Sequence, residues 1–254
     1  MKADYALLDP TGNLTLLAET PAPPALQPRL AAALARLEPK AEQVGFFSCA
    51  GERFSLRMAG GEFCGNASLC AAVLTAMARG ADALTAVGQV SGADAPVTAR
   101  VERQADGLWR GTVDMPRPEA IETVALPGGG TLPVLRFPGI SHVILRAPLP
   151  GAQAEALAPV WCAALGASAL GLLFFDEAAR SLTPLVYVPG AQTLCWESSC
   201  ASGTAAVGAF LAAEAGAPVC LTLRQPGGSL TVEAAPGGAP RLTGDVRVLK
   251  REEG

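Results

Sequence analysis

Two cysteines offer the clearest chemistry in this chain, because each stands before small residues that open an apolar helical segment. Cys64 begins Cys-Gly-Asn-Ala-Ser at 64–68, and Cys200 begins Cys-Ala-Ser-Gly-Thr at 200–204. A helix N-terminus presents unpaired N–H groups and about half a positive charge. A cysteine there is expected to ionise near neutral pH, with its pKa lowered from about 8.5 to roughly 3.5–7.5. The same N–H groups bind anions, so each motif predicts a sulfur base beside a carboxylate cradle.

The two motifs belong to an internal repeat. They lie 136 positions apart, and the same shift, without a gap, aligns further identical residues: Ala76 with Ala212, Gly80 with Gly216, Ala81 with Ala217, Gln89 with Gln225 and Gly92 with Gly228. One thiol in each half predicts a site at the junction of the halves, with a sulfur on each side of one small molecule. This arrangement suits removal of a proton from one face of a carbon and delivery of a proton to the other.

The alternative for each cysteine is a buried small hydrophobic residue, which is the usual fate of a free thiol. The duplicated context favours catalysis for Cys64 and Cys200 alone. The remaining five lack that context and are interpreted as structural: Cys49, Cys70, Cys162, Cys195 and Cys220. Seven cysteines cannot form a closed disulfide set. Thiols in a chain without a recognisable signal peptide indicate the reducing cytoplasm.

Composition excludes several other classes of function. The net charge is −4 and the basic residues form no patch, so nucleic acid is not an expected partner. With one histidine and no Cys-x-x-Cys pair, no metal site is predicted. Pyridoxal phosphate requires a Schiff-base lysine, and the three lysines present follow no glycine-rich phosphate loop. We therefore expect chemistry without a cofactor.

One uncharged segment, residues 156–175, approaches the length needed to cross a bilayer. Pro159, Gly166 and Gly171 interrupt it. We interpret it as a helix over 157–165, a turn, and a strand over 170–175, so no membrane association is expected.

The pattern of apolar residues predicts two similar halves. Helices over 67–79 and 203–215 are apolar nearly all round, which indicates helices buried on every side. A further helix is expected over 29–37. Short strands are expected around these helices, at 5–8, 14–17, 44–48, 54–58, 83–87, 97–101, 109–113, 132–137, 142–146, 182–188, 219–224, 229–233 and 246–250. We expect an α/β (α+β) chain with lobes at 1–116 and 117–254, each with a sheet wrapped around one buried helix.

The paired cysteine motifs resemble those of diaminopimelate epimerase and its relatives, and the resemblance covers nearly the whole chain. The turn at 9–13, the pair Glu42-Gln43 and the segment Gly-Ile-Ser-His at 139–142 are similar to further motifs of that family. The resemblance implies the two-lobed, pseudo-symmetric diaminopimelate epimerase-like fold, in which the last strand, here 246–250, returns to the first lobe. It also implies a small-molecule amino acid as the substrate, and a homodimer is compatible with it.

Departures from the epimerase concern the substrate. The epimerase carries a Glu-Arg pair shortly before its second cysteine, whereas residues 186–193 here hold no charge. Glu197, three residues before Cys200, instead resembles the histidine racemases of staphylopine-type metallophore synthesis. Glu42 and Glu197 would then hold a cationic or imidazole side chain. Proline racemase would place Cys-Gly-His at Cys64, and phenazine-type isomerases lack both cysteines.

Each supporting residue has a simpler explanation that remains open. His142 is compatible with a core histidine that donates to a backbone carbonyl, and Asn13 with a residue that only supports its turn. Glu42, Gln43 and Glu197 are compatible with solvated surface positions.

The sequence therefore predicts a cofactor-independent amino acid racemase that uses Cys64 and Cys200 as paired acid and base, with L-histidine as the preferred substrate. Diaminopimelate epimerase is the first alternative, and a catalytically silent amino acid-binding protein is the second. The residues expected to bind substrate are Asn13, Glu42, Gln43, Gly65, Asn66, His142, Glu197, Ala201, Ser202 and Gly203.

Overall fold

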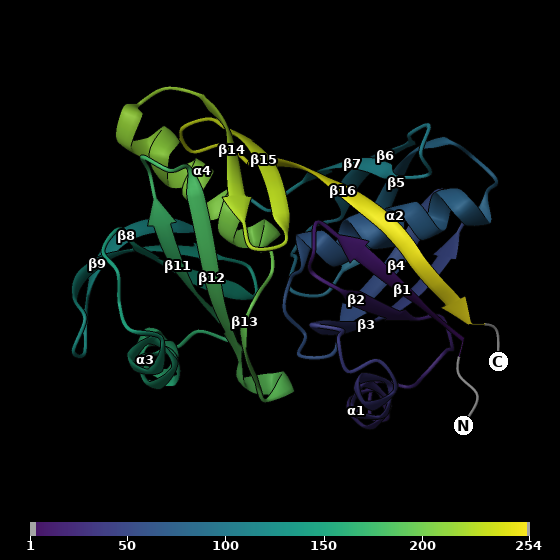
Figure 1. The fold of residues 1–254 in the computed structure, drawn as a ribbon, viewed down its shortest axis with the longest axis horizontal. Helices are drawn as coiled ribbons and strands as arrows, with labels where there is room; N and C mark the ends of the chain where they lie inside the picture. Colours follow the sequence, from purple (N-terminus) through teal and green to yellow (C-terminus); the bar gives the residue numbers. More distant parts are fainter. Residues whose placement is uncertain (1–3, 253–254) are drawn as a thin grey trace.

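The structure, a computed structural model, describes residues 4–252 and consists of two lobes with a similar order of elements, to which the second lobe adds β8, η1 and β13 (Figure 1). The first lobe contains β1 (Tyr5–Pro10), β2 (Thr15–Ala18), α1 (Gln27–Leu37), β3 (Gln43–Ala50), β4 (Arg53–Met58), α2 (Gly65–Ala78), β5 (Ala83–Val90), β6 (Val97–Arg103) and β7 (Trp109–Asp114). The second contains β8 (Ala120–Leu126), β9 (Gly130–Phe137), β10 (Ile140–Leu145), α3 (Gly151–Leu165), β11 (Leu170–Asp176), β12 (Ser181–Val188), the 3₁₀ turn η1 (Pro189–Ala191), β13 (Thr193–Trp196), α4 (Ala201–Ala215), β14 (Val219–Gln225) and β15 (Gly228–Ala234). The expected mixture of helices and strands is confirmed.

The last strand, β16 (Arg241–Glu252), connects the sheets of the two lobes. Its first residues pair with β15 of the second lobe, and on its other side it pairs with β7 of the first. Its later residues pair antiparallel with β1. The strands of both lobes therefore form one continuous sheet around two centres.

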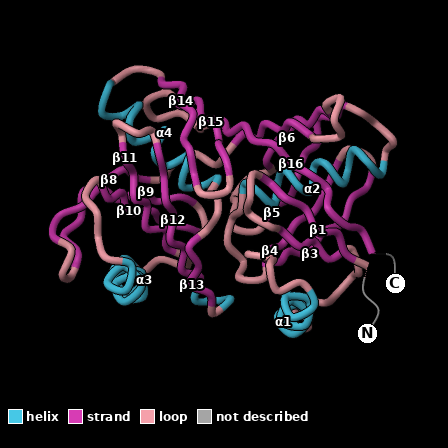
Figure 2. The backbone as a smooth tube through the Cα atoms, viewed as in Figure 1, coloured by secondary structure: helices cyan, strands magenta, loops and turns pink. Residues whose placement is uncertain are grey.

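Each lobe is built around one buried helix, as Figure 2 shows for the helices inside their surrounding strands. Every residue of α2 from Gly65 to Ala76 is buried, and α4 is buried at nearly every position from Ala201 to Ala212. The two helices start 136 positions apart, and so do β5 and β14. The repeat in the sequence thus corresponds to a repeat in the structure, and it places Cys64 and Cys200 at equivalent points.

Helices α1 and α3 cover the outer faces of the two sheets and bury separate apolar clusters. The predicted helix over 157–165 is longer than expected, because α3 begins at Gly151 and tolerates Pro159 in its interior. The first turn of α3 contains polar residues, so the apolar pattern on which the prediction depended did not show where the helix begins. Within residues 4–252 the helices are all too short or too polar to cross a membrane.

Two strands had no counterpart in the sequence-based prediction. β8 alternates exposed and half-buried residues at the edge of the second sheet, so few apolar side chains mark it. β13 has four residues and pairs only with β12 among the described strands. Short or half-exposed strands lack the apolar run on which the prediction depended.

Three pairs of glycines bring the lobes into close contact. A Cβ added to Gly227 would lie 2.7 Å from the Cα of Gly12, and one added to Gly139 would lie 2.9 Å from the Cα of Gly92. Gly12 and Gly139 occupy the equivalent turns β1–β2 and β9–β10, while Gly92 and Gly227 occupy the turns β5–β6 and β14–β15. The two contacts are therefore related by the approximate two-fold relation between the lobes.

In the third glycine pair, the two residues occupy corresponding positions in the two lobes. Gly60 precedes α2, and Gly190 lies in η1, which occupies the corresponding place before α4. A Cβ on Gly190 would lie 3.0 Å from the carbonyl oxygen of Gly60. Backbone thus meets backbone at all three points, and the lobes are closed upon each other.

Candidate active site

Cys64 and Cys200 cap the two buried helices in the same way. Each cysteine has an extended backbone, and its Sγ accepts from the N–H three residues later: Ala67 at 3.3 Å and Gly203 at 3.4 Å. The first residues of the helices face each other, since a Cβ on Gly65 would lie 2.8 Å from the Cβ of Ala201. The remaining first-turn N–H groups of both helices are available to an anion between them.

A chain of side-chain hydrogen bonds orients the Cys64 thiol. Its Sγ donates to Oε1 of Gln43 at 3.1 Å. Gln43 in turn donates through Nε2 to Oδ1 of Asn13 at 2.5 Å and to Oγ1 of Thr15 at 2.7 Å. Gln43 is half-buried, whereas Asn13 and Thr15 are buried. This series of hydrogen bonds fixes the orientation of the Gln43 amide, whose oxygen accepts the hydrogen bond of the thiol.

Glu42 joins the two lobes rather than pointing a free carboxylate at the cleft. It accepts from Asn13 Nδ2 at 2.9 Å in its own lobe, and from the Ser198 N–H at 3.1 Å and the Ser198 hydroxyl in the other. Asn13 and Asn66 both donate to the carbonyl oxygen of Ser199, at 3.0 and 3.1 Å. These bonds hold the segment before Cys200 against the first lobe.

Cys200 has a different set of partners. Its N–H donates to Gln225 Oε1 at 2.8 Å, and its Sγ lies 3.5 Å from the Ser202 hydroxyl. The carboxyl group of Glu197 lies close enough to this thiol for the two groups to shift each other's pKa. One thiol therefore has a neutral amide as its neighbour, and the other an ionisable carboxyl group.

Both sulfurs border one small cavity between the lobes, of about 30 Å³. Its walls come from both halves of the chain, and the lining residues are Asn13, Gln43, Glu62, Phe63, Cys64, Gly65, Asn66, Ile140, Val186, Val188, Glu197, Cys200, Ala201 and Ser202. Nine of the twelve residues expected from the sequence line this cavity. The predicted site is thus brought together at the junction of the lobes.

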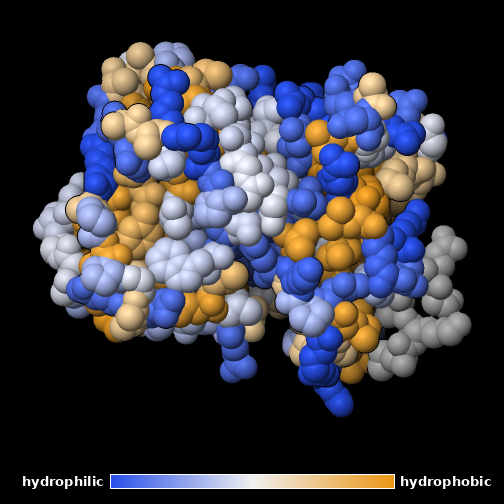
Figure 3. All heavy atoms as spheres, in the orientation of Figure 1, coloured by the Kyte–Doolittle hydropathy of each residue, from blue (hydrophilic) through white to orange (hydrophobic). Residues whose placement is uncertain are grey.

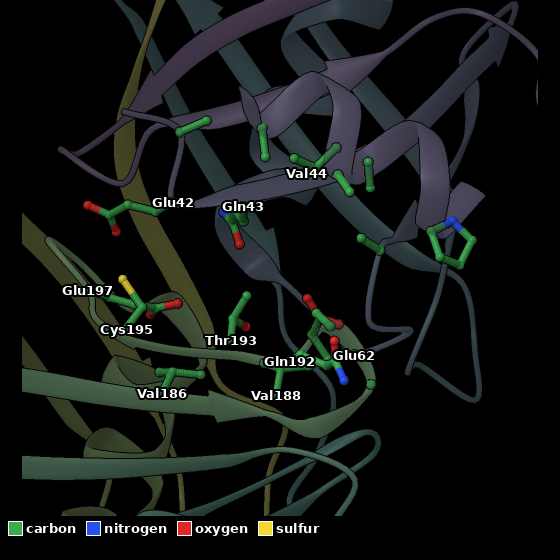
Figure 4. Close-up of a pocket in the computed structure, with 18 residues that line it drawn as sticks. Glu42, Gln43, Val44, Glu62, Val186, Val188, Gln192, Thr193, Cys195 and Glu197 are labelled. Atoms are coloured by element: carbon green, nitrogen blue, oxygen red, sulfur yellow. The ribbon is translucent and has the colours of Figure 1, made fainter. Parts of the chain in front are cut away.

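A larger chamber of about 350 Å³ adjoins this cavity, and Gln43, Glu62, Val186, Val188 and Glu197 line both. The chamber lies between α1 and the η1–β13 segment, where the surface in Figure 3 is hollowed between the lobes. Figure 4 shows Glu42 and Glu197 on one side of the chamber and Glu62 on the other, with the sulfur of Cys195 also on the wall. Cys195, interpreted as structural from the sequence, therefore lies beside the site.

The electrostatics of the two thiols differ from the sequence-based expectation. Burial raises the pKa of Cys64 to about 12 and that of Cys200 well above its usual range. The N–H groups that reach each sulfur lower the pKa, but removal of a thiolate from water outweighs them. The expectation of a lowered pKa is therefore wrong for both cysteines, because burial shifts both pKa values upward.

Three carboxyl groups share this low-dielectric region. Burial raises the pKa of Glu197 to about 8, and it also raises the pKa of Glu62 and Glu42 above their usual range. Among the described residues that line the cavity and the chamber, none is Lys, Arg or His. The site therefore favours a cationic ligand, because a cation stabilises the ionised carboxylates.

Comparison with known proteins supports this assembly. A sequence profile of the N-terminal domain of the histidine racemase CntK matches residues 2–240. The histidine racemase of Fusobacterium nucleatum is 31% identical over 227 residues, which is 82% of this chain and 81% of that protein. The chain belongs to the histidine racemase family. It is accordingly an isomerase of the amino acid racemase class.

Solved structures agree with this family at the level of the fold. A structure described as a probable proline racemase from Agrobacterium radiobacter K84 has a TM-score of 0.72 at 14% identity, covering 99% of this chain and 92% of that one. A hydroxyproline epimerase from Agrobacterium vitis has a TM-score of 0.69 at 13% identity, covering 98% and 91%. The α+β racemase-like fold is thus shared beyond the histidine racemase family.

Two of the twelve expected residues lie apart from the cavity and the chamber in this family member. His142 is fully buried on β10, with its ring at 75° to that of Phe137, and within residues 4–252 neither of its nitrogens has a hydrogen-bond partner. Burial lowers its pKa to about 3, so it is neutral. Gly203 lies behind Cys200, and a Cβ there would meet Leu173. Its N–H reaches the sulfur, so its contribution is through the backbone.

Sequence reasoning missed five residues that line the cavity, namely Glu62, Phe63, Ile140, Val186 and Val188, and it also missed Gln225. Glu62 lines both spaces, and its position two residues before Cys64 was the available signal, because Glu197 stands similarly before Cys200. Gln225 holds the Cys200 N–H, and the repeat had aligned it with Gln89 without assigning either a role. Gln89 is exposed, so only one copy of the pair acts at a cysteine.

Proposed function

We propose that this chain interconverts L- and D-histidine by a two-base reaction at Cys64 and Cys200. The observation that carries the proposal is that both sulfurs cap facing helices and border one cavity. An α-carbon between them would expose its hydrogen to one sulfur and its opposite face to the other.

The helix N-termini provide the place for the substrate's α-carboxylate. First-turn N–H groups of α2 and α4, at Gly65, Asn66, Ala201 and Ser202, come from residues that line the cavity. Loss of the α-proton moves negative charge onto the carboxylate, and N–H groups aimed there stabilise that charge in the transition state. Small side chains let the substrate approach this backbone.

The hydrogen-bond partners of the thiols suggest how protons move. One cysteine, as a thiolate, takes the α-proton and becomes a thiol, while the other gives up its thiol proton to the opposite face and becomes a thiolate. No proton is consumed. Glu197 is placed to accept the proton of Cys200, and a cationic substrate among the carboxylates favours the ionised forms of these groups.

The substrate must enter through the chamber, because the cavity between the sulfurs, at about 30 Å³, is too small for an amino acid. We infer that the lobes separate to admit an amino acid and close around it. Closure removes water from the thiolate and carbanion, which strengthens the electrostatic contacts.

Histidine is the substrate that the charges of the site favour. The absence of Lys, Arg and His among the described lining residues leaves a distal carboxylate, as in diaminopimelate, without a partner beside three Glu side chains. An imidazole can donate hydrogen bonds to them. The Fusobacterium nucleatum relative is itself a histidine racemase.

Incubation of the protein with L-histidine in D₂O tests the proposal. We expect D-histidine by chiral chromatography and deuterium at the α-carbon of both enantiomers. LL-diaminopimelate under the same conditions should react at least tenfold more slowly. Efficient epimerisation of LL-diaminopimelate with no action on histidine would contradict the proposal, and binding without exchange would identify a silent binding protein.

A further inference from the structure

The three carboxyl groups of the site differ in their existing partners. Both oxygens of Glu42 accept hydrogen bonds, from Asn13 in one lobe and Ser198 in the other. Glu197 lies beside the Cys200 thiol, and each group shifts the pKa of the other. Glu42 therefore holds the two lobes together, whereas Glu197 influences the protonation of the Cys200 sulfur.

Glu62 is the carboxyl group with an unused oxygen. Its Oε2 is buried and has no hydrogen-bond partner among residues 4–252, and the backbone groups of Glu62 and Gly60 offset only part of the rise that burial causes in its pKa. A Cβ on Gly60 would lie 2.5 Å from this Oε2 and 2.5 Å from Val188 Cγ1. The glycine therefore makes room for the Glu62 carboxyl group against the opposite lobe.

The position of Glu62 is also the right one for a contact with substrate. It lies on the wall common to the catalytic cavity and the larger chamber. In Figure 4 it lies across the chamber from Glu42 and Glu197. A buried carboxylate without a cation is costly, and a ligand N–H or ammonium group would offset that cost.

We propose that Glu62 is the specificity-determining residue that binds the cationic or N–H-donating side chain of the substrate. This inference rests on the proposed function, in that the substrate is an amino acid held between the two cysteines. It gives the three carboxyl groups separate duties: Glu42 joins the lobes, Glu197 serves Cys200, and Glu62 recognises the substrate.

The variant Glu62→Gln tests this division. The amide keeps the shape of the side chain, but it carries no charge and offers one acceptor fewer. We expect KM for L-histidine to rise at least tenfold and kcat to change less than threefold. Glu52→Gln, in an exposed turn of the same lobe, is the matched control and should resemble the wild type. An unchanged KM in Glu62→Gln, or a loss confined to kcat, would overturn the inference.

Calorimetric binding of histamine separates this inference from the proposed function, because histamine carries the imidazole but has no α-carboxylate and cannot racemise. We expect Glu62→Gln to weaken histamine binding at least tenfold relative to Glu52→Gln. If histidine is not racemised but histamine binding still depends on Glu62, the proposed function fails and the role of Glu62 stands. If histidine is racemised and both variants behave alike, the function stands and the role of Glu62 is rejected.

Discussion

Gly12 and Gly227, one from each lobe, approach so closely that a Cβ on Gly227 would lie 2.7 Å from the Gly12 Cα. Gly12 also has a φ of +86°, which L side chains rarely adopt. The contact closes the cleft next to Asn13, which belongs to the hydrogen-bond chain that orients Cys64.

We expect Gly12→Ala to lower activity more than tenfold, because the methyl group would hold the lobes apart. Gly51→Ala is the control: Gly51 has a φ of +61° and open space around it, so it carries the backbone strain without the contact between lobes. Turnover measurements with urea denaturation would separate the two effects. Equal activities in the two variants would show that closure tolerates the added methyl group.

Replacement of either catalytic cysteine should abolish racemisation. Serine is a far weaker base than a thiolate at neutral pH, and a positioned acid or base contributes about 10²–10⁴-fold. We expect Cys64→Ser and Cys200→Ser to lose at least 100-fold in turnover while thermal unfolding changes little. Cys220→Ser, at an exposed thiol, should remain active. More than a tenth of wild-type turnover in either catalytic variant would exclude the two-base scheme.

Glu197 should make the folded state less stable as the pH rises. Its pKa is raised from 4.5 to about 8, so between those values the folded chain holds a proton that the unfolded chain releases. The free energy of unfolding of the wild type, relative to Glu197→Gln, should therefore fall by about 1.4 kcal/mol per pH unit within this window. Urea denaturation of both proteins at pH 5, 6 and 7.5 measures this difference. A difference independent of pH would mean that Glu197 is ionised throughout.

His142 should act in the opposite direction. Its pKa is lowered from 6.5 to about 3, so below pH 6.5 the unfolded chain binds a proton that the folded chain does not. His142→Leu removes this proton uptake and two buried nitrogens without partners. Relative to the wild type, the variant should gain about 2 kcal/mol of stability between pH 7.5 and pH 5. Turnover should be within threefold, whereas a tenfold loss would restore His142 to the site.

Most of the site could be predicted from local patterns. Cys64 and Cys200 stood out because a small-residue turn before an apolar helix defines both a cap and a buried position. The repeat then implied that the two caps meet, which the contact between Gly65 and Ala201 shows in atomic detail.

The remainder depended on contacts between distant segments. The partner of Glu42 in the other lobe, Ser198, lies 156 positions further along the chain, so the part of Glu42 in joining the lobes had no local signal. The direction of the cysteine pKa values was missed because the degree of burial depends on how tightly the lobes close. His142 was placed by a motif, but its side chain faces the core.

Strand β16 has a further consequence for the chain as a folding unit. Its backbone completes the sheets on both sides, at β15 and at β7 and β1. A fragment that ends near residue 116 would leave β1 and β7 with exposed edges, so neither half should be autonomous, and heat should unfold the pair in one cooperative transition. The same strand limits how the cleft can open: since it cannot leave either sheet, opening must take the form of bending about it. Strand β16 thus both connects the two lobes and serves as the hinge between them.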